Sequence, residues 1–328
     1  MKYKDTNDCY DIDEDDYEGW YDTLADLSRG NLKKRIWDSY ISNNHKLDAR
    51  KTGFQFMDGE SRLQNFKPGF YVVGANPSVG KTTWCYQLAE QLAEKGTPAL
   101  FVSCEMPTEL LLLKSFARKS QIDNQQIDAG FTNDILKTVS TELDNKNVPL
   151  FIYCPKTRQA KKIWEMVQKF HEKFVDQHPV VIVDYLQYIQ VAWKYNTDKQ
   201  RIDEIIRQMK YLQVQMNLTW ITISQFNRAS YGSSVSLESF KETGDIEYTA
   251  DVIWGLQYSV YNGRGTGNSS KTVSHQERDA AIKADPRKIT LRCIKNRFGP
   301  LYSVDFDYYP QFDLFMERPT RSSISFSC

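Results

Sequence analysis

The sequence predicts an α/β protein with a mostly parallel central sheet, flanking helices and a β-hairpin near the C-terminal end. Two observations favour this fold class. Near-continuous apolar runs, typical of strands buried on both faces, alternate along the chain with segments of helical periodicity. A glycine-rich stretch, "GANPSVGKTT" at residues 74–83, also joins the first of these strands to the helix that follows it.

The expected elements follow in order along the chain. Strands are expected at residues 69–74, 97–105, 148–155, 179–189, 218–225, 251–258 and 288–295, with a closing hairpin at residues 301–315. Helices, recognised by apolar residues at helical spacing, are expected at residues 31–45, 82–96, 107–120, 157–177 and 198–217. The polar residues 262–286 are predicted to form a long, mobile surface excursion.

The composition is that of an ordinary globular protein with balanced charge. The 328 residues are 41% hydrophobic and 26% charged, which suffices for one large domain or two small ones. Because Lys+Arg and Asp+Glu both total 42, any contact with nucleic acid has to come from local patches. One positive cluster, residues 155–162, is expected to be a solvated helical face. The cysteines show no metal-ligand spacing, so free thiols are expected.

Three regions are predicted along the chain. Residues 1–30 are rich in acidic side chains and are expected to form a disordered tail, with a docking peptide as the alternative. Residues 31–49 would form a linker-like amphipathic helix, and residues 50–328 would form the α/β domain. No signal-peptide pattern and no apolar segment long enough to span a bilayer is evident, so a cytoplasmic location is expected.

The glycine-rich stretch fits the pattern G-x-x-x-x-G-K-[ST]. In this pattern backbone N–H groups surround phosphate, the lysine reaches the terminal phosphates and the hydroxyl binds Mg²⁺. A simple turn between a strand and a helix is the alternative, but it gives no reason for Lys followed by Thr at the helix start. The sequence therefore predicts a site for ATP and Mg²⁺, with nucleotide contacts at Gly74, Ser78, Gly80, Lys81, Thr82 and Thr83.

Polar side chains at the ends of other strands could complete this site, because catalysis in an open α/β sheet collects at the carboxyl ends of its strands. Asp184 ends an apolar run, as a carboxylate that holds Mg²⁺ should, although it could instead only cap a helix. Glu105 could accept a proton from the attacking water as general base, or could be a surface residue. Gln225 is suited to sensing whether a γ-phosphate is present.

A set of motifs, taken in order, resembles the C-terminal RecA-like motor domain of DnaB-type replicative helicases. The motifs read "TGFQFMD" with "FYVVGANPSVGKTT", then "FVSCEMPTELL", "VVIVDYLQYIQ", "ITISQFNR", "FKETGDIEYTADVI" and "IKNRFGP". The resemblance runs from about residue 50 to residue 316, and the order of the motifs is far more specific than any one of them. It implies a RecA-like P-loop NTPase fold and an ATP-dependent DNA helicase that acts in DNA replication.

The resemblance implies roles for the residues at the strand ends. Lys81 and Thr82 would bind the phosphates and Mg²⁺, and Asp184 would order Mg²⁺. Glu105 would activate water, and Gln225 would couple the γ-phosphate to DNA-facing loops.

Two further motifs would act beyond this nucleotide site. Lys295 and Arg297 match a finger that reaches the nucleotide held by the next subunit, where positive charge would stabilise the transition state. Without the resemblance they would be interpreted as solvated cations at a hairpin tip. Lys241, Glu242 and Gly244 match a loop that touches the backbone of single-stranded DNA, with an exposed helix start as the alternative.

The chain departs from this family in one large respect. Because residues 1–30 are too few for the family's N-terminal helical domain, that domain is expected to be missing; in the family it helps build the ring and receives primase and loader proteins. The expected partners are single-stranded DNA, further copies of the chain in a homo-hexamer, and a separate loader or primase. The alternative to a translocating helicase is an ATPase switch or scaffold of the same fold. A strand-pairing recombinase and a phosphotransferase fit the motifs less well.

Overall fold

The computed structural model describes residues 51–58, 66–131, 133–145, 148–192, 195–227, 230–231, 233–240, 244–262 and 273–319. Contacts divide the chain between Asp48 and Ala49, and every described residue belongs to the unit Ala49–Cys328. The tail predicted at residues 1–30 and the linker-like helix predicted at residues 31–49 therefore lie outside the described residues.

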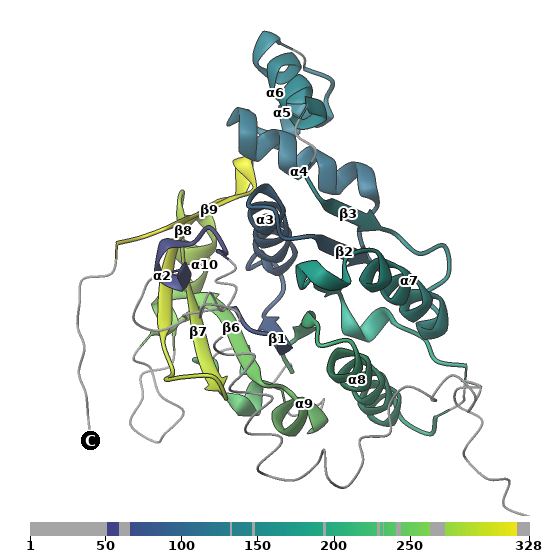
Figure 1. The fold of residues 1–328 in the computed structure, drawn as a ribbon. Coiled ribbons are helices and arrows are strands. Elements are labelled where there is room, and N and C mark those ends of the chain that lie inside the picture. The colour runs from purple at the N-terminus through teal and green to yellow at the C-terminus, as the bar shows by residue number, and fades with distance from the viewer. Residues whose placement is uncertain are drawn as a thin grey trace, which may run out of the picture. The chain divides into compact units, whose positions relative to one another are not determined.

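The described residues form one mixed sheet whose nine strands lie in the order β3-β2-β4-β5-β1-β6-β7-β8-β9 (Figure 1). The strands are β1 (Gly69–Ala75), β2 (Ala99–Ser103), β3 (Leu150–Tyr153), β4 (Val180–Asp184), β5 (Thr219–Gln225), β6 (Val252–Tyr258), β7 (Arg287–Asn296), β8 (Ser303–Tyr309) and β9 (Leu314–Glu317). Neighbouring strands from β3 to β6 are parallel, and β7, β8 and β9 continue the sheet in antiparallel fashion. The predicted fold class is confirmed.

Helices connect the parallel strands and cover the sheet (Figure 1). The longer ones are α3 (Lys81–Glu94) after β1, α4 (Thr108–Ser120) after β2, α7 (Ala160–Lys173) after β3 and α8 (Asp198–Gln215) after β4. Three short helices, α2 (Gln55–Asp58), α9 (Gly244–Thr249) and α10 (His275–Lys283), precede β1, β6 and β7. None of the described helices has the length and apolar character that crossing a membrane requires. Because their strands are parallel, β1, β2, β4 and β5 present their carboxyl ends at one edge of the sheet.

The two largest differences from the sequence-based prediction are helices in residues 262–286 and in residues 121–147. Residues 262–286, predicted as a surface excursion, contain α10, because a capping box between Ser274 and Glu277 starts a helix there. The Ser274 hydroxyl accepts from the Glu277 N–H at 3.2 Å, and the Glu277 carboxylate accepts from the Ser274 N–H at 2.9 Å. Residues 121–147, for which no element is predicted, contain the helices α5 (Asn124–Asp128) and α6 (Asp134–Asn145), which lie beyond α4 (Figure 1).

An aromatic cluster fixes α3 on the sheet. The Trp84 ring of α3 stacks on Phe54 with centroids 5.7 Å apart, and it meets Trp254 and Phe306 edge-on at 5.8 and 6.5 Å. All four side chains are buried, and the burial of one large apolar side chain contributes about 2 to 3 kcal/mol to folding. The start of α3 is therefore held firmly at the carboxyl end of β1.

Candidate nucleotide site

The loop between β1 and α3 is shaped by its glycines. Gly80, which precedes α3, has a φ of 100°, a left-handed conformation that favours glycine. A Cβ at Gly80 would lie 2.8 Å from the Phe315 ring, and a Cβ at Gly74 would lie 2.4 Å from the Phe240 ring. Both positions therefore require glycine for packing as well as for the approach of phosphate to the backbone. Ser78 lies between them, also with a positive φ, at 64°.

The Lys81 side chain folds back over this loop. Its Nζ donates to the Ala75 carbonyl at 3.1 Å and to the Asn76 carbonyl at 3.5 Å. Burial lowers the pKa of Lys81, and the nearby carboxylates of Asp184 and Glu105 raise it. Lys81 thus lies close to both carboxylates that are predicted for this site.

Asp184 is the last residue of β4, so the strand predicted to reach residue 189 ends there, and its side chain is buried. The Thr82 hydroxyl hydrogen-bonds its carboxyl group, whose Oδ2 is buried with no hydrogen-bond partner in the described part of the chain. Burial raises the pKa of Asp184 to about 6; Thr82 opposes this increase, Glu105 adds to it and Lys81 opposes it. A hydroxyl beside a carboxylate with an oxygen to spare is a ligand set that fits Mg²⁺.

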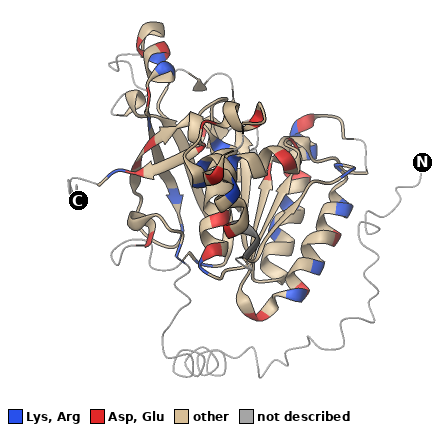
Figure 2. Cartoon of the chain, turned by 90° about the horizontal axis from the view of Figure 1, so that it is seen from above, with Lys and Arg blue, Asp and Glu red and all other residues tan. Residues whose placement is uncertain are grey.

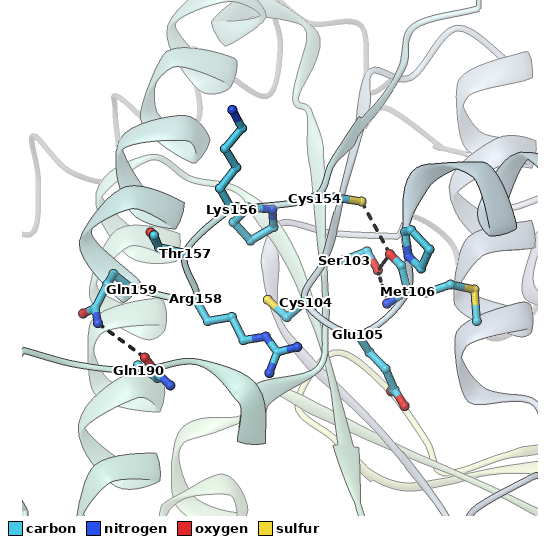
Figure 3. A pocket seen from close by; sticks show the side chains of 12 residues that line it. Ser103, Cys104, Glu105, Met106, Cys154, Lys156, Thr157, Arg158, Gln159 and Gln190 are labelled. Atoms are coloured by element: carbon cyan, nitrogen blue, oxygen red, sulfur yellow. Dashed lines mark hydrogen bonds between the residues drawn. The ribbon is translucent and has the colours of Figure 1, made fainter.

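Glu105 follows β2 and is one of the residues that line a cavity of about 610 Å³ (Figure 3). Ser103, the last residue of β2, is in register with Asp184 of the neighbouring strand β4. Strand pairing therefore carries Glu105 to the side of the sheet where Asp184 lies. The Glu105 side chain is exposed, so water and a phosphate group can reach its carboxylate.

Two basic side chains of residues 155–162, the cluster predicted to lie on a solvated helical face, line this cavity. Lys156 and Arg158 lie in the loop between β3 and α7, a helix that begins only at Ala160 (Figure 3). The Arg158 guanidinium lies 4.5 Å from the centroid of the Tyr188 ring. The signal that could have located them is their position directly after a parallel strand, at the same edge of the sheet as Glu105.

Gln225 is the last residue of β5 and is in register with Ala75 at the end of β1. The next residue, Phe226, donates its N–H to the Ala75 carbonyl at 3.4 Å. The structure therefore brings Gln225 to the same edge of the sheet as Lys81 and Asp184.

Lys295 and Arg297, the finger predicted from sequence, lie toward the opposite edge. β7 runs antiparallel to β6, and Lys295 pairs with Ile253 near the start of β6. The start of β6 lies beside Tyr71, near the start of β1, whereas the glycine-rich loop follows the end of β1. A strand of seven residues such as β1 spans about 20 Å. The finger and the glycine-rich loop of one chain are therefore separated by nearly the length of a strand.

Comparison with known proteins assigns this arrangement to a family. A family model described as "DnaB-like helicase C terminal domain" matches residues 50–317. The chain belongs to this family. The predicted resemblance over residues 50 to 316 is thereby confirmed.

Relatives of this DnaB-like chain are longer than it is. A probable replicative DNA helicase of Trieres chinensis is 26% identical over 82% of this chain and 59% of the relative. The replicative DNA helicase DnaB of Geobacillus stearothermophilus is 23% identical over 89% of this chain and 63% of the relative. The chain therefore spans less than two thirds of the length of these relatives.

Solved structures share the fold of this DnaB-like domain. One, described as an ATPase domain, superposes with a TM-score of 0.73 at 19% identity, covering 89% of this chain and all of that one. A structure described as a DnaB-like replicative helicase and its interactions with primase gives a TM-score of 0.70 at 19% identity, covering 88% of this chain and 66% of that one. These likenesses confirm the predicted RecA-like fold.

The hydroxyl of Thr83, a predicted nucleotide contact, hydrogen-bonds another side chain of the DnaB-like domain. The Thr83 Oγ1 donates to Asp313 Oδ1 at 3.1 Å, and the Lys114 Nζ donates to the same oxygen at 2.6 Å. The Asp313 carbonyl accepts from Arg118 at 2.6 Å. Lys114, Arg118 and Asp313 thus support the start of α3 from positions that no sequence motif marks.

The residues predicted to touch DNA fall at the limits of what the structure describes. Lys241 and Glu242 lie outside the described residues, and Gly244 begins α9. Figure 2 shows residues of both charges interspersed over the helices. Among the described residues this view shows no uniformly basic face, so a contact with nucleic acid would depend on local residues.

Proposed function

We propose that this chain is the motor of a replicative DNA helicase, a ring-forming enzyme that hydrolyses ATP and translocates on single-stranded DNA. The observation that carries the proposal is the separation of two half-sites within one domain. Lys81, Thr82 and Asp184 converge near the carboxyl edge of the sheet. Arg297 lies toward the opposite edge, too far away to reach the same nucleotide. Membership of the family and relatives named as replicative helicases support this function.

Hydrolysis would use the groups of this chain in distinct roles. Lys81 would hold the terminal phosphates, and the Thr82 hydroxyl and Asp184 carboxylate would be ligands for Mg²⁺, which neutralises phosphate charge when bound. Glu105 would take a proton from the attacking water as its oxygen bonds to the γ-phosphorus and the bond to the β,γ-bridging oxygen breaks. ADP and inorganic phosphate leave. Gln225 would contact the γ-phosphate and couple its loss to DNA-facing loops.

A second copy of the chain would complete each site. Arg297, with Lys295 beside it, would enter from the neighbouring subunit and stabilise transition-state charge, a contribution of about 10³-fold or more in other NTPases. A copy that carries a nucleotide site at one edge and a finger at the other makes a head-to-tail interface, which can repeat until it closes into a ring. We propose that this ring is a hexamer.

Single-stranded DNA is the proposed nucleic-acid partner, contacted by Lys241, Glu242 and Gly244. One structural neighbour is described with its interactions with primase. A separate primase or loader is therefore the proposed protein partner. The proposed location of the chain is the cytoplasm.

The test is steady-state ATP hydrolysis by the full chain with and without a long single-stranded DNA, followed by strand displacement on a forked duplex. DNA should raise the rate by about tenfold or more, which corresponds to about 1.4 kcal/mol of coupling. A slow rate that is indifferent to DNA would refute a motor that acts alone. DNA-stimulated hydrolysis without strand displacement would instead identify a DNA-bound switch.

A further inference from the structure

Both cations of the proposed finger are bonded to the end of α9. The Arg297 Nη2 donates to the Tyr248 carbonyl at 2.9 Å, and the Lys295 Nζ donates to the Glu247 carbonyl at 2.7 Å. Carbonyls in the last turn of a helix have no partners within the helix, and cations stabilise them. The finger therefore caps the helix that begins at Gly244, the last of the proposed DNA-contacting residues.

Asp251 holds Arg297 from a second side. Its Oδ1 accepts from the Arg297 Nη1 at 2.9 Å, and the backbone N–H of Arg297 donates to the backbone carbonyl of Asp251 at 2.9 Å. Its Oδ2 accepts from the Lys210 Nζ of α8 at 2.7 Å and from the Phe70 N–H of β1 at 2.8 Å. The Asp251 side chain is only 11% exposed, whereas that of Arg297 is 51% exposed. The buried Asp251 carboxylate thus orients the Arg297 side chain, which still reaches the surface.

This pairing leaves Arg297 able to bind phosphate. A guanidinium has several N–H donors in a fixed planar fork. Asp251 and the Tyr248 carbonyl each take one bond from a different terminal nitrogen. Among the described residues no other side-chain bond of Arg297 is present, so its other N–H groups remain for the oxygen atoms of a phosphate on a neighbouring subunit.

We propose that Asp251 is the positioning residue for Arg297, and that through α9 it makes the orientation of the finger depend on the DNA-contacting segment of the same chain. This inference rests on the proposed function. The segment from Gly244 through α9 and Asp251 leads directly into β6, which pairs with the finger strand β7. A shift of α9 when DNA binds would move the carbonyls that hold both cations. DNA bound by one subunit would then set the rate at the nucleotide of the next.

The experiment compares Asp251→Asn with Lys210→Gln in the full chain. Asp251→Asn removes both ion pairs of the Asp251 carboxylate, whereas Lys210→Gln removes only the pair with Lys210 and leaves the hold on Arg297 in place. An Asn can still accept from the Phe70 N–H. We expect Asp251→Asn to lower DNA-stimulated kcat by roughly tenfold to 100-fold, the cost of a small misplacement of a reacting group. The KM for ATP and the affinity for single-stranded DNA should stay unchanged, and Lys210→Gln should leave kcat unchanged. Equal losses in both variants would overturn the proposal, as would an unchanged or increased kcat for Asp251→Asn.

Mixed assemblies separate this inference from the proposed function. Lys81→Ala subunits lack a working nucleotide site but keep their finger, so they should restore hydrolysis at the sites of neighbouring Asp251→Asn subunits. A subunit that had merely lost its fold would not be restored. Mixtures of Lys81→Ala with Arg297→Ala test the proposed function alone. Restoration of Arg297→Ala but not of Asp251→Asn would overturn the role of Asp251, whereas restoration of neither would refute the finger itself.

Discussion

At the level of single residues, the pKa values of two buried aspartates at opposite edges of the sheet shift in opposite directions because their neighbours differ. Burial raises the pKa of Asp184 to about 6, and a hydroxyl and nearby lysines offset this only in part. The pKa of Asp251 lies below its ordinary value: burial raises it, but hydrogen bonds from Lys210, the Phe70 N–H and Arg297 together outweigh burial. The first carboxylate is suited to bind an added cation, and the second is suited to orient a cation of the chain itself.

Lys81→Ala and Arg297→Ala should separate nucleotide binding from hydrolysis. Lys81→Ala removes a charge that holds the phosphates, so hydrolysis should be abolished. Arg297→Ala removes a charge that acts mainly in the transition state, so hydrolysis should fall by about 10³-fold or more while nucleotide binding persists. Equilibrium binding of a fluorescent ATP analogue and release of phosphate measure the two effects. Substantial turnover by the Arg297→Ala protein would contradict the assignment of the finger.

At the scale of elements, the C-terminal strands support the glycine-rich loop and α3. The Gln87 side chain of α3 bonds the N–H and the carbonyl of Phe315 in β9, at 2.8 and 2.9 Å. The Phe315 ring occupies the space that a side chain at Gly80 would need. β9 also holds α2, because the Glu317 carboxylate accepts from the Phe56 N–H at 2.8 Å. The conformation of the loop thus depends on strands that are more than 200 residues away in the chain.

Glu317→Gln should change how the stability of the fold depends on pH. Burial raises the pKa of Glu317, more than the bond from the Phe56 N–H lowers it, and its Oε2 has no hydrogen-bond partner among the described residues. The folded protein therefore holds this proton more tightly than the unfolded chain does. This contribution stabilises the fold at low pH and is lost as the pH rises through the raised pKa.

Thermal unfolding between pH 4 and pH 8 measures this effect. The Glu317→Gln protein should gain stability relative to the wild type as the pH rises, because it has no carboxylate to ionise at this position. Glu109→Gln, at an exposed site on α4, controls for the loss of one acidic group. A difference between Glu317→Gln and wild type that does not change with pH would show that this carboxyl group is not responsible.

For the molecule as a whole, the direction of strand β7 decides where Lys295 and Arg297 lie relative to the glycine-rich loop. Since β7 runs against β6, its end lies near the start of β1, whereas a parallel strand in that place would end beside the glycine-rich loop. Lys81 and Asp184 therefore lie toward one edge of the sheet, and Arg297 lies toward the opposite edge. Under the proposed function, this arrangement makes hydrolysis depend on assembly and lets each subunit act on the next.

Lys241→Ala should weaken the binding of single-stranded DNA and flatten its dependence on salt. Binding releases fewer counterions when one phosphate contact is lost. The slope of log K against log salt should therefore become less steep by about 0.7. Titrations followed by fluorescence anisotropy at several salt concentrations measure this slope. Lys137→Ala, at an exposed lysine of α6, should leave the slope as it is in the wild type. An unchanged slope for Lys241→Ala would place the DNA elsewhere.

The amino-acid sequence alone predicts the α/β class, the order of nearly all strands and helices along the chain, and the candidate residues Lys81, Thr82, Asp184, Glu105 and Gln225. These features could be predicted because apolar periodicity, the glycine-rich pattern and the last residue of a strand are local properties of the chain. The cap of α10 was also local, since Ser274 and Glu277 have the spacing of a capping box.

The packed fold, and not the sequence pattern, sets the hydrogen-bond partners and neighbours of the functional side chains. It directs the Thr83 hydroxyl to Asp313, places Arg158 beside the cavity next to Glu105, and pairs Arg297 with Asp251. These contacts join residues from about 46 to 230 positions apart, and they depend on the order and direction of the strands. Periodicity shows which face of an element is buried, but only the packed sheet brings particular side chains within hydrogen-bond distance.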